Sequence, residues 1–289
     1  MERSHRAIQK LMEGQNFKSV EDMNNFLREN LTGRVLEDDA PPASDPKERA
    51  QELAYEAMDA DAADESLRLA REALEFDPDN VDALLVQLQH TVREDEEQVT
   101  ELRSIVAAGE RSLGADFLAE NKGRFWGILE TRPYMRARAE LAEVLRYLDR
   151  HDEAIAEYEA LLELNPNDNQ GVREPLLGLY LLTGRLETAR SLLAQFESDI
   201  LAGMLWGAVF LHYLAGDRGK AIAAFRRARK YNRHMVPILT GRRSMPDVGD
   251  AYRLGSEEEA AQTISYLGEV AVKHPDAVRW MDQMNRKLV

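Results

Sequence analysis

The side chains that could perform acid–base or metal chemistry are numerous in this sequence, but their spacing assembles no recognised site. The six histidines are scattered, and no pair has the H-x-x-x-H or H-E-x-x-H spacing with which imidazoles on one helix bind zinc. Most of the 52 aspartates and glutamates lie on expected helix surfaces, one turn from a lysine or arginine, which is typical of a solvated face. The sequence also contains no Gly-rich phosphate loop and no G-x-S-x-G nucleophile elbow. We therefore predict a protein that is not an enzyme and that has no catalytic residues, no metal site and no cofactor.

Aromatic rings and arginines are concentrated in the stretch RFWGILETRPYMRAR, from Arg124 to Arg138. Arginine binds carboxylates and phosphates through paired hydrogen bonds, so this stretch could bind an anion or an acidic peptide. The structural alternative is that Phe125 and Trp126 are too apolar to lie in water and close the junction between two groups of helices. In that case the arginines bond to helix ends or to acidic neighbours. We favour the structural alternative and keep Arg132 and Arg138 as possible anion-binding residues.

A strongly basic stretch extends from Arg218 to Arg243, with nine lysines and arginines and no acidic residue. The net charge of the chain is −15, so the other residues sum to −15 − 9 = −24. Such a stretch can receive an acidic peptide or a phosphate, or it can pair with acidic neighbours such as those at 257–259. We favour pairing within the chain. The further candidates for anion binding are Arg173, Arg226, Arg227 and Lys230.

Composition restricts the possible partners and the compartment. The acidic balance, with a pI near 5.0, argues against nucleic acid and anionic membranes as partners. There is no cysteine, which excludes disulfides and thiolate chemistry. The uncharged run between Asp199 and Asp217 is shorter than the roughly 20 residues that a membrane-spanning helix needs, so we expect a buried helix there. The first residues lack the apolar core of a signal peptide, and a cytoplasmic location is the expectation.

Helical periodicity is nearly continuous from Lys47 onward, and no strand pattern interrupts it. Two short helices are expected before it, the second started by Ser19 with Asp22 three residues later. The Pro- and Asp-rich segment that follows them is a linker. The predicted organisation is 1–31 amino-terminal helices, 32–46 linker, 47–114 amino-terminal repeats, 115–134 insert, 135–232 three repeats and 233–289 capping helices.

Two segments share one pattern: DESLRLAREALEFDPDN, starting at Asp64, and DEAIAEYEALLELNPND, starting at Asp152. Each resembles the second helix of a tetratricopeptide repeat, whose period is 34 residues. The resemblance extends over Met135–Asp168, Gln170–Phe196 and Ala202–Asn232. It implies an all-α, tetratricopeptide-like α-solenoid of antiparallel helix pairs in a right-handed superhelix. The small residues at the helix crossings are Ala154, Ala189 and Ala221.

The carboxy-terminal part has a second resemblance. The segments YNRHMVPILTGRRSMP and GSEEEAAQTISYLGEVAVKHPDAVRWM are similar to the tail of the suppression-of-tumorigenicity family. That family implies no reaction. Within the repeats, Arg138 and Arg173 occupy the same position in successive units. We expect the two guanidinium groups to lie near each other and to need a counter-charge, for which Glu174, Asp168 and Glu130 are candidates.

The repeat resemblance also implies a site, because the concave groove of such proteins is lined by recurrent first-helix positions. In this sequence those positions include Arg136, Glu143, Arg146, Tyr147, Trp206, Phe210 and Tyr213. We expect a non-catalytic scaffold that binds a protein or peptide segment, with its polar end at the arginines and an apolar side chain on the aromatic rings. In one alternative, helices from Ser256 onward cover the aromatic residues. In others, the chain is a regulatory subunit or enzyme of unknown reaction, or an adaptor for an anionic ligand through 218–243.

Overall fold

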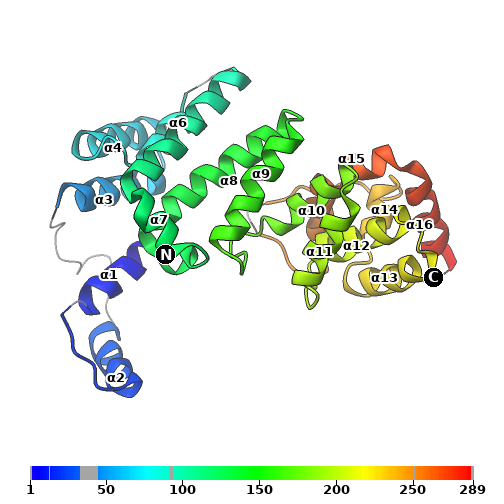
Figure 1. The fold of residues 1–289 in the computed structure, drawn as a ribbon, viewed down its shortest axis with the longest axis horizontal. Helices are drawn as coiled ribbons and strands as arrows, with labels where there is room; N and C mark the ends of the chain where they lie inside the picture. Colours follow the sequence, from blue (N-terminus) through cyan, green and yellow to red (C-terminus); the bar gives the residue numbers. More distant parts are fainter. Residues whose placement is uncertain (1, 13, 33–44, 92–93, 250, 288–289) are drawn as a thin grey trace. The chain divides into compact units, whose positions relative to one another are not determined.

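The computed structural model describes residues 2–12, 14–32, 45–91, 94–249 and 251–287. Within these ranges every regular element is a helix and no strand occurs (Figure 1). Consecutive helices pack as antiparallel pairs, most extensively α3 with α4 and α12 with α13. The predicted all-α repeat fold is therefore confirmed. The predicted linker, 32–46, lies mostly outside the described residues.

The chain divides into two compact units, Met1–Val144 and Leu145–Val289, which meet inside helix α8 (Arg132–Tyr147). The sequence places a boundary earlier, at Met135. Before α8, unit 1 contains α1 (Glu2–Met12), α2 (Val20–Leu31), α3 (Pro46–Asp59), α4 (Ala63–Phe76), α5 (Val81–Gln89), α6 (Asp95–Leu113), α7 (Ala115–Asn121), η1 (Phe125–Gly127) and η2 (Leu129–Thr131). After α8, unit 2 contains α9 (His151–Leu164), α10 (Arg173–Leu182), α11 (Leu186–Gln195), α12 (Ala202–Leu214), α13 (Arg218–Tyr231), α14 (Met235–Leu239), α15 (Glu257–Lys273) and α16 (Pro275–Lys287).

Short polar residues and glycines set the ends of several helices. The Ser19 hydroxyl accepts a hydrogen bond from the backbone N–H of Asp22 at 3.0 Å, which is the predicted start of α2. Asp45 caps α3 in the same way, with Pro46 in the first turn. Gly184 and Gly216 follow α10 and α12 with φ values of 76° and 77°, in the left-handed region that glycine adopts without strain. These local signals explain why the helices are short and change direction often.

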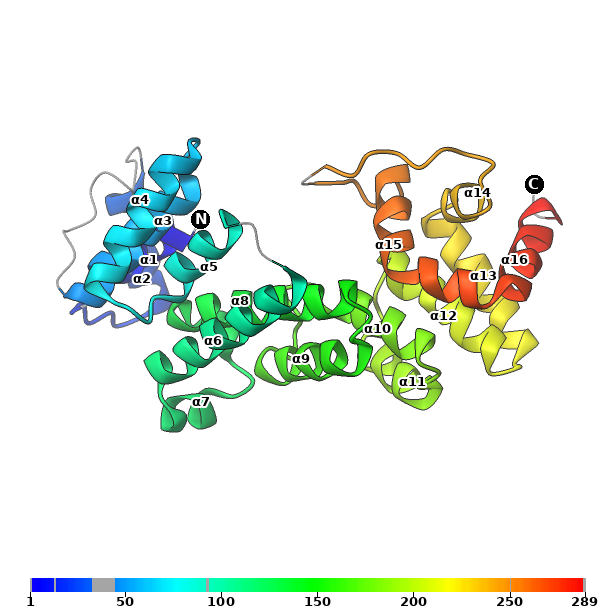
Figure 2. The same ribbon diagram turned by 90° about the horizontal axis from the view of Figure 1, so that it is seen from above.

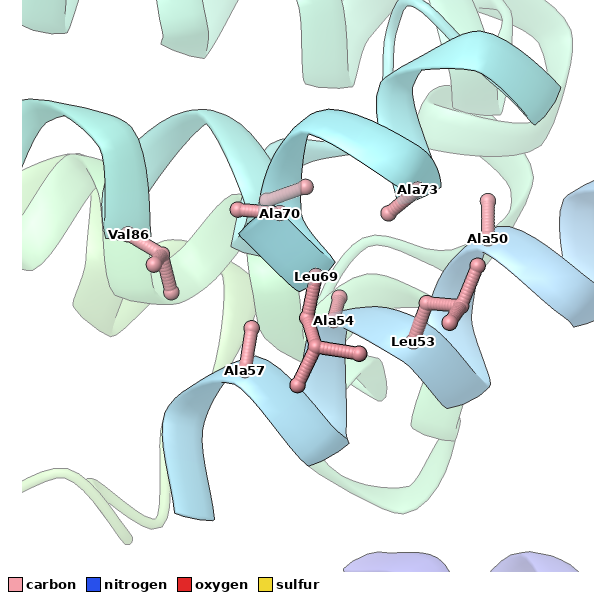
Figure 3. Packing of buried hydrophobic residues seen from close by; sticks show 9 residues of the cluster. Ala50, Leu53, Ala54, Ala57, Leu69, Ala70, Ala73 and Val86 are labelled. Carbon is pink, nitrogen blue, oxygen red and sulfur yellow. The ribbon is translucent and has the colours of Figure 1, made fainter. Parts of the chain in front are cut away.

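The core of unit 1 is built from small side chains where α3, α4 and α5 meet (Figure 3). Ala50, Ala54 and Ala70 are fully buried, and Leu53 and Leu69 fill the space between the helices. Alanine at a crossing lets two helix backbones approach closely, so that a few leucines complete the packing.

The core of unit 2 surrounds α12, which packs against α10, α13 and α15 (Figure 2). This helix is the uncharged run of the sequence, and its 13 residues are mostly buried, as predicted. Ala154, Ala189 and Ala221, expected at helix crossings, are all fully buried in the structure. Among the described residues, no helix combines the length and the apolar character needed to cross a membrane.

Candidate functional site

Three helices of unit 1 place polar side chains beside one another. Arg136 on α8 binds Asp82 on α5 through two hydrogen bonds, Nε to Oδ1 at 3.0 Å and Nη2 to Oδ2 at 2.7 Å. Gln51 on α3 donates to the same Asp82 carboxylate at 2.7 Å, and Asn80 donates to the Gln51 carbonyl at 3.1 Å. Each of α3, α5 and α8 is the first helix of its pair. We call the polar residues on these helices the first-helix face of unit 1: Glu48, Gln51, Glu52, Tyr55, Asp82, Arg132 and Arg136.

Partial burial of the charged side chains determines the electrostatics of this face. The Asp82 side chain is only 1% exposed, and the guanidinium of Arg136 pairs with its carboxylate. Burial lowers the pKa of Arg136, but the carboxylates of Asp82 and Glu2 more than offset this, and the net change is upward. Burial, followed by the negative charges of Glu2 and Asp82, raises the pKa of Tyr55. Arg136 therefore stays charged and is fixed in orientation by Asp82.

The amino-terminal helix α1 lies on this face through its first residue. Arg136 donates from Nη1 to Oε1 of Glu2 at 2.8 Å, and Nη1 of Arg132 lies 3.6 Å from the same oxygen. The Tyr55 hydroxyl donates to the other Glu2 oxygen at 3.4 Å. One carboxylate of α1 is thus bound by two arginines and a tyrosine from α3 and α8.

The other end of α1 is bound by acidic residues of α3. Nζ of Lys10 lies 3.2 Å from Glu48 and 3.6 Å from Glu52. Arg6 lies one turn nearer the start of α1 and approaches Glu48 at 3.9 Å. Because Glu2, Arg6 and Lys10 are spaced by four residues, they lie along one side of α1. Along that side of α1, the acidic Glu2 pairs with the arginines of α8, and the basic Arg6 and Lys10 pair with glutamates of α3.

A hollow of about 330 Å³ opens next to α1 in unit 1. Its lining includes Arg6 of α1, Glu48 and Tyr55 of α3, and Tyr134 of α8. Acidic side chains outnumber basic ones in this lining: Asp45, Glu48, Asp77, Asp79 and Glu130 against Arg6 and Lys47. The hollow suits a basic or amide-bearing side chain of a ligand.

The arginine- and aromatic-rich stretch has mainly a structural role in unit 1. Phe125 is fully buried, and the buried Thr131 hydroxyl donates to the Phe125 carbonyl at 2.6 Å. Arg132 donates to the Trp126 carbonyl at 3.0 Å and lies over the Trp126 ring at 4.7 Å. Arg138 donates to the Tyr134 hydroxyl at 3.2 Å. These contacts favour the structural interpretation, although Arg132 also reaches the carboxylate of α1.

The aromatic end of the predicted groove is closed in unit 2. Trp206 and Phe210 are fully buried, so a peptide cannot reach them, and the expectation that they line an open groove does not agree with the structure. Helix α15 packs across α10 and α12, and a Cβ atom added to Gly178 would collide with the backbone carbonyl of Tyr266. Tyr213 is half-buried, with its ring 5.2 Å from that of Trp280. The structure thus favours the alternative in which carboxy-terminal helices cover these residues.

The remaining groove candidates lie near the end of α8. Arg146 donates to the Ser265 carbonyl of α15 at 3.3 Å and lies 5.9 Å from the Tyr266 ring centroid, so it helps to hold α15. Tyr147 is 79% exposed, and Glu143 is partly buried. Of the seven predicted peptide-binding residues, Arg136 belongs to the first-helix face of unit 1, where it binds a carboxylate of α1.

The anion-binding candidates of unit 2 are largely occupied by the chain itself. Arg173 binds Asp168 at 2.8 Å and Asp199 at 2.6 Å, so Asp168 provides a predicted counter-charge. Arg227 donates to the backbone carbonyls of Glu197 and Asp199. Arg226 and Lys230 are exposed, and Nζ of Lys230 lies 5.9 Å from the Tyr231 ring centroid. Arg138 and Arg173 lie in different units, and their predicted proximity stays a prediction.

Pairing within the chain is visible in the basic stretch. Arg243 lies 2.9 Å from Glu257, one of the acidic residues considered in the sequence, and Arg242 pairs with Asp282. Lys220 binds Asp217 at 3.1 Å. These pairs agree with the favoured interpretation for part of the stretch.

Two buried glutamates of unit 2 cap a helix, a role that the sequence analysis did not predict for them. Glu174 accepts a hydrogen bond from the backbone N–H of Gly203 at 2.9 Å, and Glu259 accepts one from Ala202 at 3.1 Å. Leu201 precedes α12 and cannot cap it, so the two carboxylates satisfy the first amides of the helix. Burial raises the pKa of Glu174 to about 7, against the opposing hydrogen bond from Gly203.

One group of potential metal ligands is present among the described residues of unit 2: Asp149, His151 and Glu269. Nε2 of His151 lies 3.5 Å from Asp149 and 3.8 Å from Glu269. Both carboxylates are more than half exposed, at 81% and 55%. Exposed carboxylates beside a histidine are common without a bound metal, so this group alone does not establish a metal site.

Comparison with known proteins identifies one part of the chain. Residues 136–168 match the tetratricopeptide repeat family, at the position where the sequence predicts its clearest repeat. The match supports a tetratricopeptide-repeat protein, a class that generally mediates protein interactions. No curated protein matched the chain. The resemblance of the carboxy-terminal part to the suppression-of-tumorigenicity family is not confirmed by these comparisons.

Proposed function

We propose that this protein is a non-catalytic interaction scaffold that binds a segment of a partner protein on the first-helix face of unit 1. The single observation behind the proposal is the set of contacts that this face makes with α1. Arginines bind the acidic end of a helix there, and glutamates bind its basic end. Repeat proteins use such faces as extended binding surfaces.

The corresponding face of unit 2 is a weaker candidate because α15 packs closely over it. An adaptor for an anionic ligand through residues 218–243 is also weaker, since several of those side chains already bind acidic groups or carbonyls of the chain. A protein partner fits the acidic composition better than nucleic acid does.

The proposal is tested by affinity capture with the full chain and two matched charge reversals. Glu48→Lys changes the first-helix face, whereas Glu75→Lys makes the same change on the exposed side of α4. We expect Glu48→Lys to weaken binding of the captured partner by at least tenfold and Glu75→Lys to have little effect. Equal affinity of both variants and the wild type would remove this face as the binding surface.

A further inference from the structure

The helix α1 differs from the helix that covers the equivalent face of unit 2. Seven residues of α15 are buried: Glu259, Ala260, Ala261, Thr263, Leu267, Val270 and Ala271. Ala7 is the one buried residue of α1, all of which the structure describes. Burial of apolar area is the main stabilising contribution to helix packing, so α15 belongs to the core of its unit. Four side chains of α1 form ion pairs with α3 or α8: Glu2, Arg3, Arg6 and Lys10.

The ion pairs of α1 are only partly shielded from water. The exposed fraction of the paired side chains is 11% for Lys10, 20% for Glu48 and 34% for Arg3, which approaches Asp59 at 3.6 Å. The Arg3–Asp59 pair, with Asp59 exposed, weakens with salt, and in the more buried pairs the cost of removing the charges from water offsets much of their attraction. The helix is nevertheless held at a high effective concentration because it is part of the same chain. These are the properties of a ligand that can be displaced.

We propose that α1 is a built-in ligand of the first-helix face of unit 1 and that the partner is a helical segment that takes its place. The partner segment has an acidic residue in its first turn, which binds Arg136 and Arg132. It has basic residues one and two turns later, which bind Glu48 and Glu52. This inference rests on the proposed function, because it identifies the partner and the regulation of the same face.

Displacement has a quantitative consequence. While α1 occupies the face, the apparent affinity for a competing segment is reduced by the fraction of time that the face is free. A change in α1 that breaks its contacts but leaves the face unaltered should therefore increase that affinity. Lys10→Glu is such a change, because it places a third carboxylate beside Glu48 and Glu52.

The test uses a fluorescent peptide with the sequence of residues 2–12, added to the full chain. We expect it to bind Lys10→Glu on the order of tenfold more tightly than the wild type. Gln9→Glu is the matched control, because it introduces a glutamate at a neighbouring, exposed position of α1 and should bind like the wild type. Hydrogen exchange should show faster exchange in α1 of Lys10→Glu with the remaining helices unchanged.

Reversing the charge in both the peptide and the first-helix face gives a second, independent readout. A peptide with glutamate in place of Lys10 should bind poorly to a chain with intact glutamates at 48 and 52, and should recover binding to the Glu48→Lys/Glu52→Lys chain. The inference is overturned if the original peptide binds the wild type and Lys10→Glu equally well, or binds neither. The proposed function is then still tested by the capture experiment. If the peptide behaves as expected but Glu48→Lys does not change the affinity for the captured partner, the proposed function fails. In that case α1 only covers the face as a structural helix.

Discussion

Replacement of Glu174 by glutamine should change how the stability of unit 2 depends on pH. The Glu174 side chain is buried, with 8% of the residue exposed, and it caps α12 through the Gly203 amide. Its pKa is about 7 in the folded protein, against an ordinary value of 4.5. Between these two pH values the folded state binds more protons than the unfolded state. The free energy of unfolding must therefore fall as the pH rises through this window.

The size of the effect follows from the same two values. A tenfold difference in proton affinity corresponds to about 1.4 kcal/mol, so the difference between 4.5 and about 7 corresponds to about 3 kcal/mol. Glutamine retains a carbonyl oxygen that can accept from Gly203 but does not ionise. We expect Glu174→Gln to gain about 2.5 kcal/mol relative to the wild type between pH 5 and pH 8, since part of the change already occurs below pH 5.

Urea unfolding at several pH values, followed by tryptophan fluorescence, measures this difference. Trp206 and Trp280 lie in unit 2, and Trp126 lies in unit 1. Both proteins should have Trp126 replaced by phenylalanine, so that the signal reports unit 2. A difference in unfolding free energy that stays constant from pH 5 to pH 8 would refute the reasoning. A relative loss of stability of Glu174→Gln with rising pH would show instead that the ionised carboxylate stabilises α12.

Three further substitutions test the packing of unit 2. Ala189→Leu overpacks a fully buried helix crossing and should lower the free energy of unfolding by about 1–3 kcal/mol, whereas an unchanged urea midpoint would place Ala189 away from the crossing. Gly178→Ala brings a methyl group against the Tyr266 carbonyl and should also cost about 1–3 kcal/mol, with faster hydrogen exchange in α15. Unchanged exchange there would contradict the close approach of α10 and α15. Ser256→Ala removes the acceptor for the Glu259 amide and should cost about 1 kcal/mol, measured by urea unfolding, unless the cap is not formed in solution.

The sequence predicted the fold because the signals involved are local. The uncharged run around Trp206 is too short to span a membrane and has the length of a buried helix. The alanines at 154, 189 and 221 recur at the repeat spacing, and each is fully buried. Such features depend on helix periodicity and on neighbouring turns, which are readable without knowledge of distant contacts.

The site was predicted only in part because it depends on long-range contacts. Repeat register drew attention to Arg136, and the same register also selected Trp206 and Phe210, which are fully buried in the structure. Whether a later helix covers a groove is decided by complementarity between distant segments. One sequence signal for this covering was the glycines Gly178 on α10 and Gly203 on α12, which allow close approach of other groups.

The residues of α3 that bind α1 were missed for a similar reason. The acidic residues Glu48 and Glu52 are one helical turn apart, and so are the basic residues Arg6 and Lys10. Each pair alone resembles an ordinary solvated surface. Only the fold places the two pairs beside each other, together with Asp82, which lies outside the clear repeats.

Hydrogen exchange of the full chain with and without the captured partner tests the central claim most directly. The account predicts that saturating partner accelerates exchange in α1 on the order of tenfold, because the partner segment replaces α1 on the first-helix face of unit 1. Exchange in α1 that stays the same or becomes slower when the partner binds would contradict the account.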